Sequence, residues 1–188
     1  MRPTLAHLIV RFDGYDNDMI EDNLNGCTGS LGSLSNFTAL VTLEVSIALL
    51  FGQTRLSTSQ KPSLAEILPP RLRQLTINDD RWDHSVLLHT EGPLTMAVFK
   101  DFFAGERLTD DWTEDTELED TKWVKFGDPP WRTATPEFQE FVLDTRIQGR
   151  ASYGYWYEKG PKEDLQSMCA GEGIKCSVLR AYEDEPDL

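Results

Sequence analysis

The chain contains 188 residues, of which 39% are hydrophobic and 27% are charged, so it has the composition of one globular domain rather than of a disordered chain. Its formal net charge of −14 repels phosphate groups, which argues against nucleic acids and anionic membrane surfaces as partners. The longest apolar run covers only residues 47–51, far short of the length that crosses a membrane.

The first element that the sequence indicates is a repeated strand. One apolar pattern occurs four times, as Leu5-x-x-Leu8-x-Val10, Leu40-x-x-Leu43-x-Val45, Leu72-x-x-Leu75-x-Ile77 and Phe138-x-x-Phe141-x-Leu143. The starting positions are 35, 32 and 66 residues apart, and a fixed period is typical of arrays in which each unit buries its apolar face against its neighbours. Apolar residues alternate with polar ones inside each segment, which predicts strands with one buried face. A polar loop is expected at 13–30.

Helical patterns lie between the strands. Residues 63–66 spell a capping box, Ser-Leu-Ala-Glu, and two prolines follow shortly after it, which predicts a short helix. A longer helix is expected from Pro93 to about Gly105, and a last helix from Pro161 to about Gly171. Residues 174–178 then alternate as a closing strand in phase with the others. Strands joined by connections of this length should be parallel.

These elements predict an α/β fold, a leucine-rich-repeat-like solenoid of about five parallel strands with helices or loops on its outer side. Residues 1–182 would form this single domain, and residues 183–188 a frayed acidic tail. The doubled interval before Phe138 has two explanations, a repeat that has lost its pattern or an insertion. The acidic, non-alternating residues 106–122 indicate a solvated loop, which favours an insertion at about 106–135.

Several short motifs carry a resemblance to a known family. They are Pro69-Pro70-x-Leu72-x-x-Leu75, the closing segment from Ala170 to Cys176, the step Phe37-Thr38-Ala39-Leu40 and the strand exit Leu50-Phe51-Gly52. These motifs resemble the C-terminal, leucine-rich-repeat-like region of fungal F-box-type proteins. The resemblance implies a substrate-selecting arm of a ubiquitin ligase, in which an F-box ahead of the repeats docks the ligase adaptor.

The sequence departs from that family in two ways. No helical F-box sequence precedes the first strand, and the asparagine usual at the ninth repeat position is replaced by Asp13, Ala48, Asp80 and Arg146. The first strand would therefore be an uncapped sheet edge, which is a place where chains associate. We expect a fragment of a longer protein, a truncated relative, or a chain that associates with itself through this N-terminal edge strand.

One polar cluster could carry chemistry. Asp79, Asp80, Asp83 and His84 follow the third strand, and carboxylates and imidazoles can bind a divalent metal or transfer protons. The alternative is an ordinary solvated loop at a strand exit. The sequence contains no zincin, EF-hand, nucleophile-elbow or phosphate-loop spacing, so it points to no catalytic residue, cofactor or metal.

A group of large aromatic residues could instead bind a protein. The candidates lie around the insertion and after the fourth strand: Trp82, Tyr153, Tyr155, Trp156 and Tyr157. Tyrosine and tryptophan are enriched in interface hot spots, although such rings can also anchor the insertion on the domain. Three cysteines without a C-x-x-C pair indicate a reduced compartment, cytoplasmic or nuclear, and Cys169 and Cys176 are expected to be small core residues.

The sequence therefore predicts a non-catalytic protein–protein recognition module, as the resemblance implies. Its partner would be a protein of unknown identity, and no cofactor is expected. The alternative is a small metal-binding or hydrolytic enzyme that uses the acidic cluster at 79–84. A truncated remnant without any partner is the third possibility.

Overall fold

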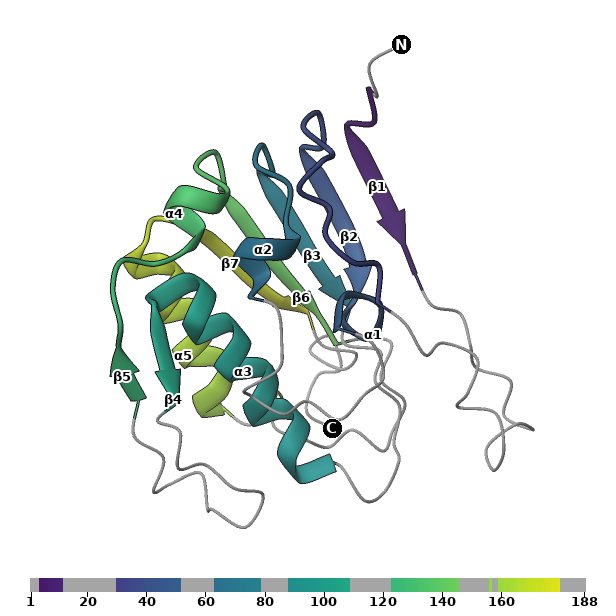
Figure 1. Ribbon diagram of the computed structural model, residues 1–188. Coiled ribbons are helices and arrows are strands. Elements are labelled where there is room, and N and C mark those ends of the chain that lie inside the picture. The colour runs from purple at the N-terminus through teal and green to yellow at the C-terminus, as the bar shows by residue number, and fades with distance from the viewer. Residues whose placement is uncertain are drawn as a thin grey trace, which may run out of the picture.

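The parallel sheet is the centre of the fold. A computed structural model describes residues 4–11, 30–51, 63–78, 88–108, 123–145, 156 and 159–179. Five strands form one all-parallel sheet in the order β1-β2-β3-β6-β7 (Figure 1), with the bounds β1 His7–Val10, β2 Thr42–Ser46, β3 Gln74–Asn78, β6 Glu140–Asp144 and β7 Lys175–Leu179. The predicted α/β class with about five parallel strands is confirmed, and so is the closing strand expected at 174–178. The sheet is open, with β1 and β7 as its edges.

The strand register explains the repeated spelling. The second apolar position of each repeat pairs across the sheet as one row, which β7 continues: Leu8, Leu43, Leu75, Phe141 and Cys176. The last apolar position forms a second row: Val10, Val45, Ile77, Leu143 and Val178. Leu43, Leu75 and Phe141 are fully buried. Because side chains alternate between faces, both rows lie on the same side of the sheet and form one continuous apolar layer.

The turn before each strand is also repeated. The amides of Leu40, Leu72 and Phe138 each bond the carbonyl three residues earlier, at 3.0, 3.2 and 2.9 Å. Directly after this turn, the carbonyls of Val41 and Arg73 each accept hydrogen bonds from two amides of the neighbouring repeat. The first apolar residue of the spelling is buried at this turn, at 0% exposure for Leu40 and Leu72 and 5% for Phe138. The repeats are thus alike in hydrogen bonding as well as in sequence.

Helices cover the apolar side of the sheet. They are α1 Ile47–Phe51, α2 Leu64–Ile67, α3 Leu88–Ala104, α4 Trp131–Ala134 and α5 Lys159–Gly171. In Figure 1 α2, α3, α4 and α5 lie on the same side of the strands. The capping box is confirmed. The Ser63 side chain accepts a hydrogen bond from the amide of Ala65 in α2, and the Glu66 side chain accepts one from the amide of Ser63. The helix predicted to end at Gly171 does end there.

Two boundaries differ from what the sequence pattern indicates. Ile47 extends the apolar alternation of Leu43 and Val45, but it begins α1, which uses the longest apolar run of the chain. The helix expected to start at Pro93 starts at Leu88. Proline suits a first turn because it lacks an amide hydrogen. In α3 it lies further in, and the loss of one hydrogen bond is offset by burial of Phe99, Phe102 and Phe103 at 0% exposure.

Aromatic rings join α3 to the sheet. Phe99 and Phe103 pack on Phe141 of β6 with ring centroids 5.0 and 5.1 Å apart, and Phe102 packs on Phe138 at 6.2 Å. Phe141 occupies the row that leucines fill in β2 and β3. Tilted and edge-on ring pairs of this kind add to the stability that burial alone provides. The longest helix is therefore packed on the sheet at β6.

The insertion is partly structured, which corrects the prediction of a loop from 106. Residues Glu106–Leu108 form β4 and Trp123–Lys125 form β5, and these strands pair antiparallel as a separate two-stranded sheet. The intervening residues of the insertion lie outside the described part of the chain. Gly105 allows the close approach of the two strands, since its φ is +66° and a Cβ there would lie 2.7 Å from the carbonyl oxygen of Gly127.

Candidate interaction surface

The second face of the sheet has no described helix over it. Its side chains come from the residues that alternate with the two apolar rows, and they form three rows of their own, one before, one between and one after the apolar rows. The first row is His7, Thr42, Gln74, Glu140 and Lys175; the second is Ile9, Glu44, Thr76, Val142 and Ser177; the third is Ser46, Asn78, Asp144 and Leu179. We call these residues the open face.

The centre of the open face is mostly neutral. Thr42, Gln74, Thr76 and Val142 are half-buried, and they present hydroxyl, amide and methyl groups rather than charges. Half-burial without an overlying helix is typical of a sheet surface whose side chains pack only against their cross-strand neighbours. Such a surface suits contact with another chain better than enclosure of a small molecule.

Ion pairs frame this neutral centre. On the β1 side, Arg11 donates to Glu44 at 2.5 Å, and on the β7 side, Lys175 donates to Glu140 at 2.5 Å. The hydrogen bond from Arg11 lowers the pKa of Glu44 below its usual value, and burial opposes this shift only in part. Because both cations are more than half exposed, the pairs contribute little to stability. The two ion pairs place charged groups at the rim of the open face.

The carboxyl ends of the central strands carry a buried polar row. Ser46, Asn78 and Asp144 lie side by side in register and are 0%, 1% and 7% exposed. The amide nitrogen of Asn78 donates to Glu44 at 3.2 Å. Its amide oxygen is buried and has no donor in the part of the chain that the structure describes. At this end of the sheet the polar side chains are therefore shielded from solvent.

The predicted partner-binding residues fall mostly outside the described residues. This is so for Trp82, Tyr153, Tyr155 and Tyr157. Trp156 is described, and it is only 3% exposed, with its ring 6.1 Å from that of Phe99. In the free chain Trp156 is thus part of the hydrophobic core and does not lie on a surface that a partner could reach.

The acidic cluster considered for chemistry also lies outside the described residues. Asp79, Asp80, Asp83 and His84 directly follow the last residue of β3. Within the described ranges, no three histidine, cysteine, aspartate or glutamate residues come together in a way that could hold a metal ion.

The hairpin β4–β5 adds surface residues that sequence reasoning missed. Phe126 follows β5 and is 66% exposed, the largest exposed fraction among the large apolar side chains of the described residues. Lys100 lies 4.1 Å from the centre of the Trp123 ring, and Arg107 lies 6.0 Å from that of Phe126. Only the pairing of β4 with β5 brings these groups together, so the linear pattern gave no signal for them.

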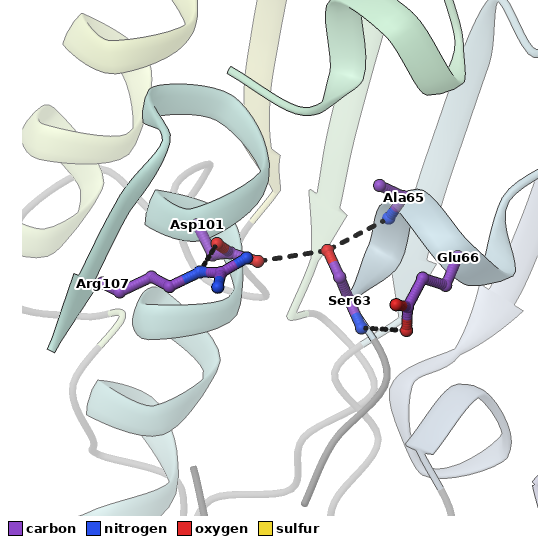
Figure 2. Close-up of polar contacts among 5 residues, drawn as sticks. All are labelled: Ser63, Ala65, Glu66, Asp101 and Arg107. Atoms are coloured by element: carbon purple, nitrogen blue, oxygen red, sulfur yellow. Dashed lines mark hydrogen bonds and ion pairs between the residues drawn. The ribbon is translucent and has the colours of Figure 1, made fainter. Parts of the chain in front are cut away.

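A polar network fixes this hairpin to the helices. Arg107 of β4 donates to the carboxylate of Asp101 at 2.5 Å, and Ser63 donates to the same carboxylate at 3.1 Å (Figure 2). Ser63 at the same time caps α2 by accepting from Ala65. The Asp101 carboxylate of α3 thus joins the start of α2, which is distant in sequence, to the neighbouring strand β4. The groove beside them, between α3, α5 and the hairpin, has a volume of about 370 Å³ and is lined by Lys100, Glu106, Lys125 and Asp164 among others.

No family model matches the chain, and neither the curated proteins nor the solved structures that were compared with it give a match. Among the residues that the structure describes, no helix has the length and apolar character that a membrane crossing requires.

Proposed function

We propose that the chain is a non-catalytic protein–protein recognition module that binds its partner on the open face. The observation that supports this proposal is the one-sided sheet, in which the described helices lie on the apolar side. Purely parallel sheets normally have helices on both faces. A parallel sheet with a face that no described helix covers offers a surface for another macromolecule.

The proposal includes a leucine-rich-repeat-like arrangement of the repeats. The strands of the parallel sheet follow one another in chain order, and the described strands β4 and β5, which lie between β3 and β6 in sequence, form a separate sheet. Such an order has no reversal point, so it lacks the crevice at which doubly wound sheets bind small ligands. Repeat arrays instead use the face opposite their helices as an extended binding surface. Resemblance to fungal F-box-type proteins supports the same function, the selection of a protein partner.

The chemistry of the open face favours a partner with exposed hydrogen-bond donors. Glu44 and Glu140 place two partly exposed carboxylates on it. The net charge of −14 also attracts positively charged surfaces from a distance, so it favours association with a cationic partner. A protein segment rich in lysine or arginine is the partner chemistry that fits.

The edge strand β1 supports self-association as a further part of the proposal. Ile9 on this strand is 62% exposed, and Leu5 just before it is 41% exposed. The residues in the same repeat position as Leu5 are buried, Leu40 and Leu72 at 0%. Unpaired backbone groups and apolar side chains at a sheet edge invite pairing with another strand. The alternative function, a metal-binding or hydrolytic enzyme, gains no support from the described residues.

Two single substitutions with equal charge change test the proposal. Thr76→Arg places a long cation in the centre of the open face, and Ser167→Arg places one on the exposed surface of α5. Proteins retained from a cell extract by the wild-type chain should be lost with Thr76→Arg and kept with Ser167→Arg, with circular dichroism showing that both variants are folded. Equal retention by all three chains would contradict the use of the open face.

A further inference from the structure

Two cysteines meet where the last helix turns into the last strand. Cys169 lies in the final turn of α5, and Cys176 is the second residue of β7. Between them the chain forms a Schellman turn, in which the amide of Ile174 bonds the carbonyl of Cys169 at 2.9 Å and that of Gly173 bonds the carbonyl of Ala170 at 3.0 Å. Gly173 supplies the left-handed conformation that this turn requires, with φ +74°. The turn directs β7 back along α5.

The strand register then brings the two thiols together. Cys176 is on the apolar side of the sheet, in the row of Leu75 and Phe141, so its side chain faces the layer that contains α5. The thiol of Cys169 shares a hydrogen bond with the sulfur of Cys176. Both cysteines are free thiols.

Their surroundings give the two thiols different reactivity. Cys169 is 0% exposed, whereas Cys176 is half-buried at the edge strand of the sheet. The hydrogen bond from Cys169 lowers the pKa of Cys176, while that bond and burial raise the pKa of Cys169. A more accessible thiol with a lowered pKa, beside a buried thiol with a raised pKa, is the arrangement found in reactive cysteine pairs.

We propose that Cys176 is a site of oxidative modification and that Cys169 converts the oxidised sulfur into a Cys169–Cys176 disulfide. With hydrogen peroxide as the oxidant, the Cys176 thiolate attacks one oxygen, the O–O bond breaks, and the other oxygen leaves as water after protonation. Cys169 then attacks the sulfenic sulfur, its proton goes to the departing hydroxyl, and a second water leaves. Two thiols lose two electrons and one peroxide gains them.

The disulfide would join the end of α5 to the edge strand β7. This edge borders the open face, where Lys175 and Ser177 alternate with Cys176. Oxidation would therefore add a covalent constraint to the one corner of the sheet that is otherwise held by the turn and by side-chain packing. The inference does not depend on the recognition function, because it uses only the other side of β7.

Peptide mapping tests the inference directly on the intact chain. The sequence places lysines at 162 and 175 and an arginine at 180, so trypsin releases Cys169 and Cys176 on separate peptides. After treatment with hydrogen peroxide and trapping of the remaining thiols with N-ethylmaleimide, mass spectrometry should find these two peptides joined, with a loss of two hydrogens. The joined species should disappear after reduction with dithiothreitol.

Three variants and one condition complete the test. Cys27→Ser should leave the joined peptides unchanged, Cys176→Ser should abolish them, and Cys169→Ser should leave Cys176 as a sulfenic acid that dimedone traps. In urea the preference for this pair should be lost. The inference is overturned if Cys176 forms a disulfide with Cys27 as readily as with Cys169, or if Cys169 and Cys176 stay reduced while Cys27 is oxidised. It is also overturned if urea leaves the yield of the Cys169–Cys176 disulfide unchanged.

Discussion

The turn leucines offer a matched comparison inside the molecule. Leu72 and Leu5 occupy the same position of the repeat spelling, but Leu72 is 0% exposed and Leu5 is 41% exposed. A leucine-to-alanine change removes three carbons, worth about 2.4 kcal/mol when the side chain is fully buried. At Leu72 the cavity left between packed repeats adds to this loss, so Leu72→Ala should cost about 3–4 kcal/mol. At Leu5 the smaller buried fraction scales the loss to about 1.4 kcal/mol, without a closed cavity.

Urea denaturation followed by far-ultraviolet circular dichroism measures both costs. The difference of about 2 kcal/mol should appear as a lower midpoint for Leu72→Ala at an unchanged slope. Thr76→Val, a change of similar volume on the open face, serves as the control and should shift stability by less than about 0.5 kcal/mol. Equal costs for Leu5→Ala and Leu72→Ala would refute the reasoning, since they would mean that the first repeat is packed as fully as the third.

Other predictions concern the glycines, the rim ion pair and the core tryptophan. Gly105→Ala should destabilise the fold more than Gly173→Ala. Both glycines have positive φ, which alone costs an alanine about 1–2 kcal/mol, but of the two only Gly105 would place the new Cβ against a backbone oxygen, at 2.7 Å. Equal melting temperatures of the two variants would argue against this close approach. The lowered pKa of Glu44 means that its pairing stabilises the fold above the unfolded-state value of 4.5 and is lost as the pH falls through the lower folded-state pKa. Arg11→Gln should therefore flatten the dependence of unfolding free energy on pH below about 5, by under about 1 kcal/mol because Arg11 is largely exposed; an unchanged slope would contradict the pairing. Trp156→Ala should lower the melting temperature by roughly 6–20 °C, since loss of a buried tryptophan costs about 3–5 kcal/mol; an unchanged melting temperature would show that its ring does not stabilise the core.

The repeat pattern was sufficient to predict the sheet. Leucine alternates with valine or isoleucine in the first three repeats, and phenylalanine with leucine in the fourth, which specifies strands with one buried face. The common period makes these strands parallel neighbours. The closing strand at 174–178 followed from the same phase. These features depend on side chains a few residues apart, so the linear sequence contains them in full.

The limits of local pattern explain the boundary errors. Ile47 continues the alternation of β2, yet the apolar run that it begins forms α1. Pro93 fits a first helical turn, yet α3 begins ahead of it, at Leu88. At Ile47, which is 1% exposed, tertiary burial outweighed a local preference that is worth about 1 kcal/mol or less at most positions.

By itself, the sequence determined the α/β class, the parallel strands, the capped helix α2 and the apolar layer, because these follow from alternation, period and a few stop signals. Only the tertiary structure decided which polar side chains become buried together, as at Asn78 and Asp144. It also decided that Trp156 lies in the core and that Cys169 meets Cys176. Such contacts join residues from different elements, and packing across the sheet, rather than spacing along the chain, sets their distance.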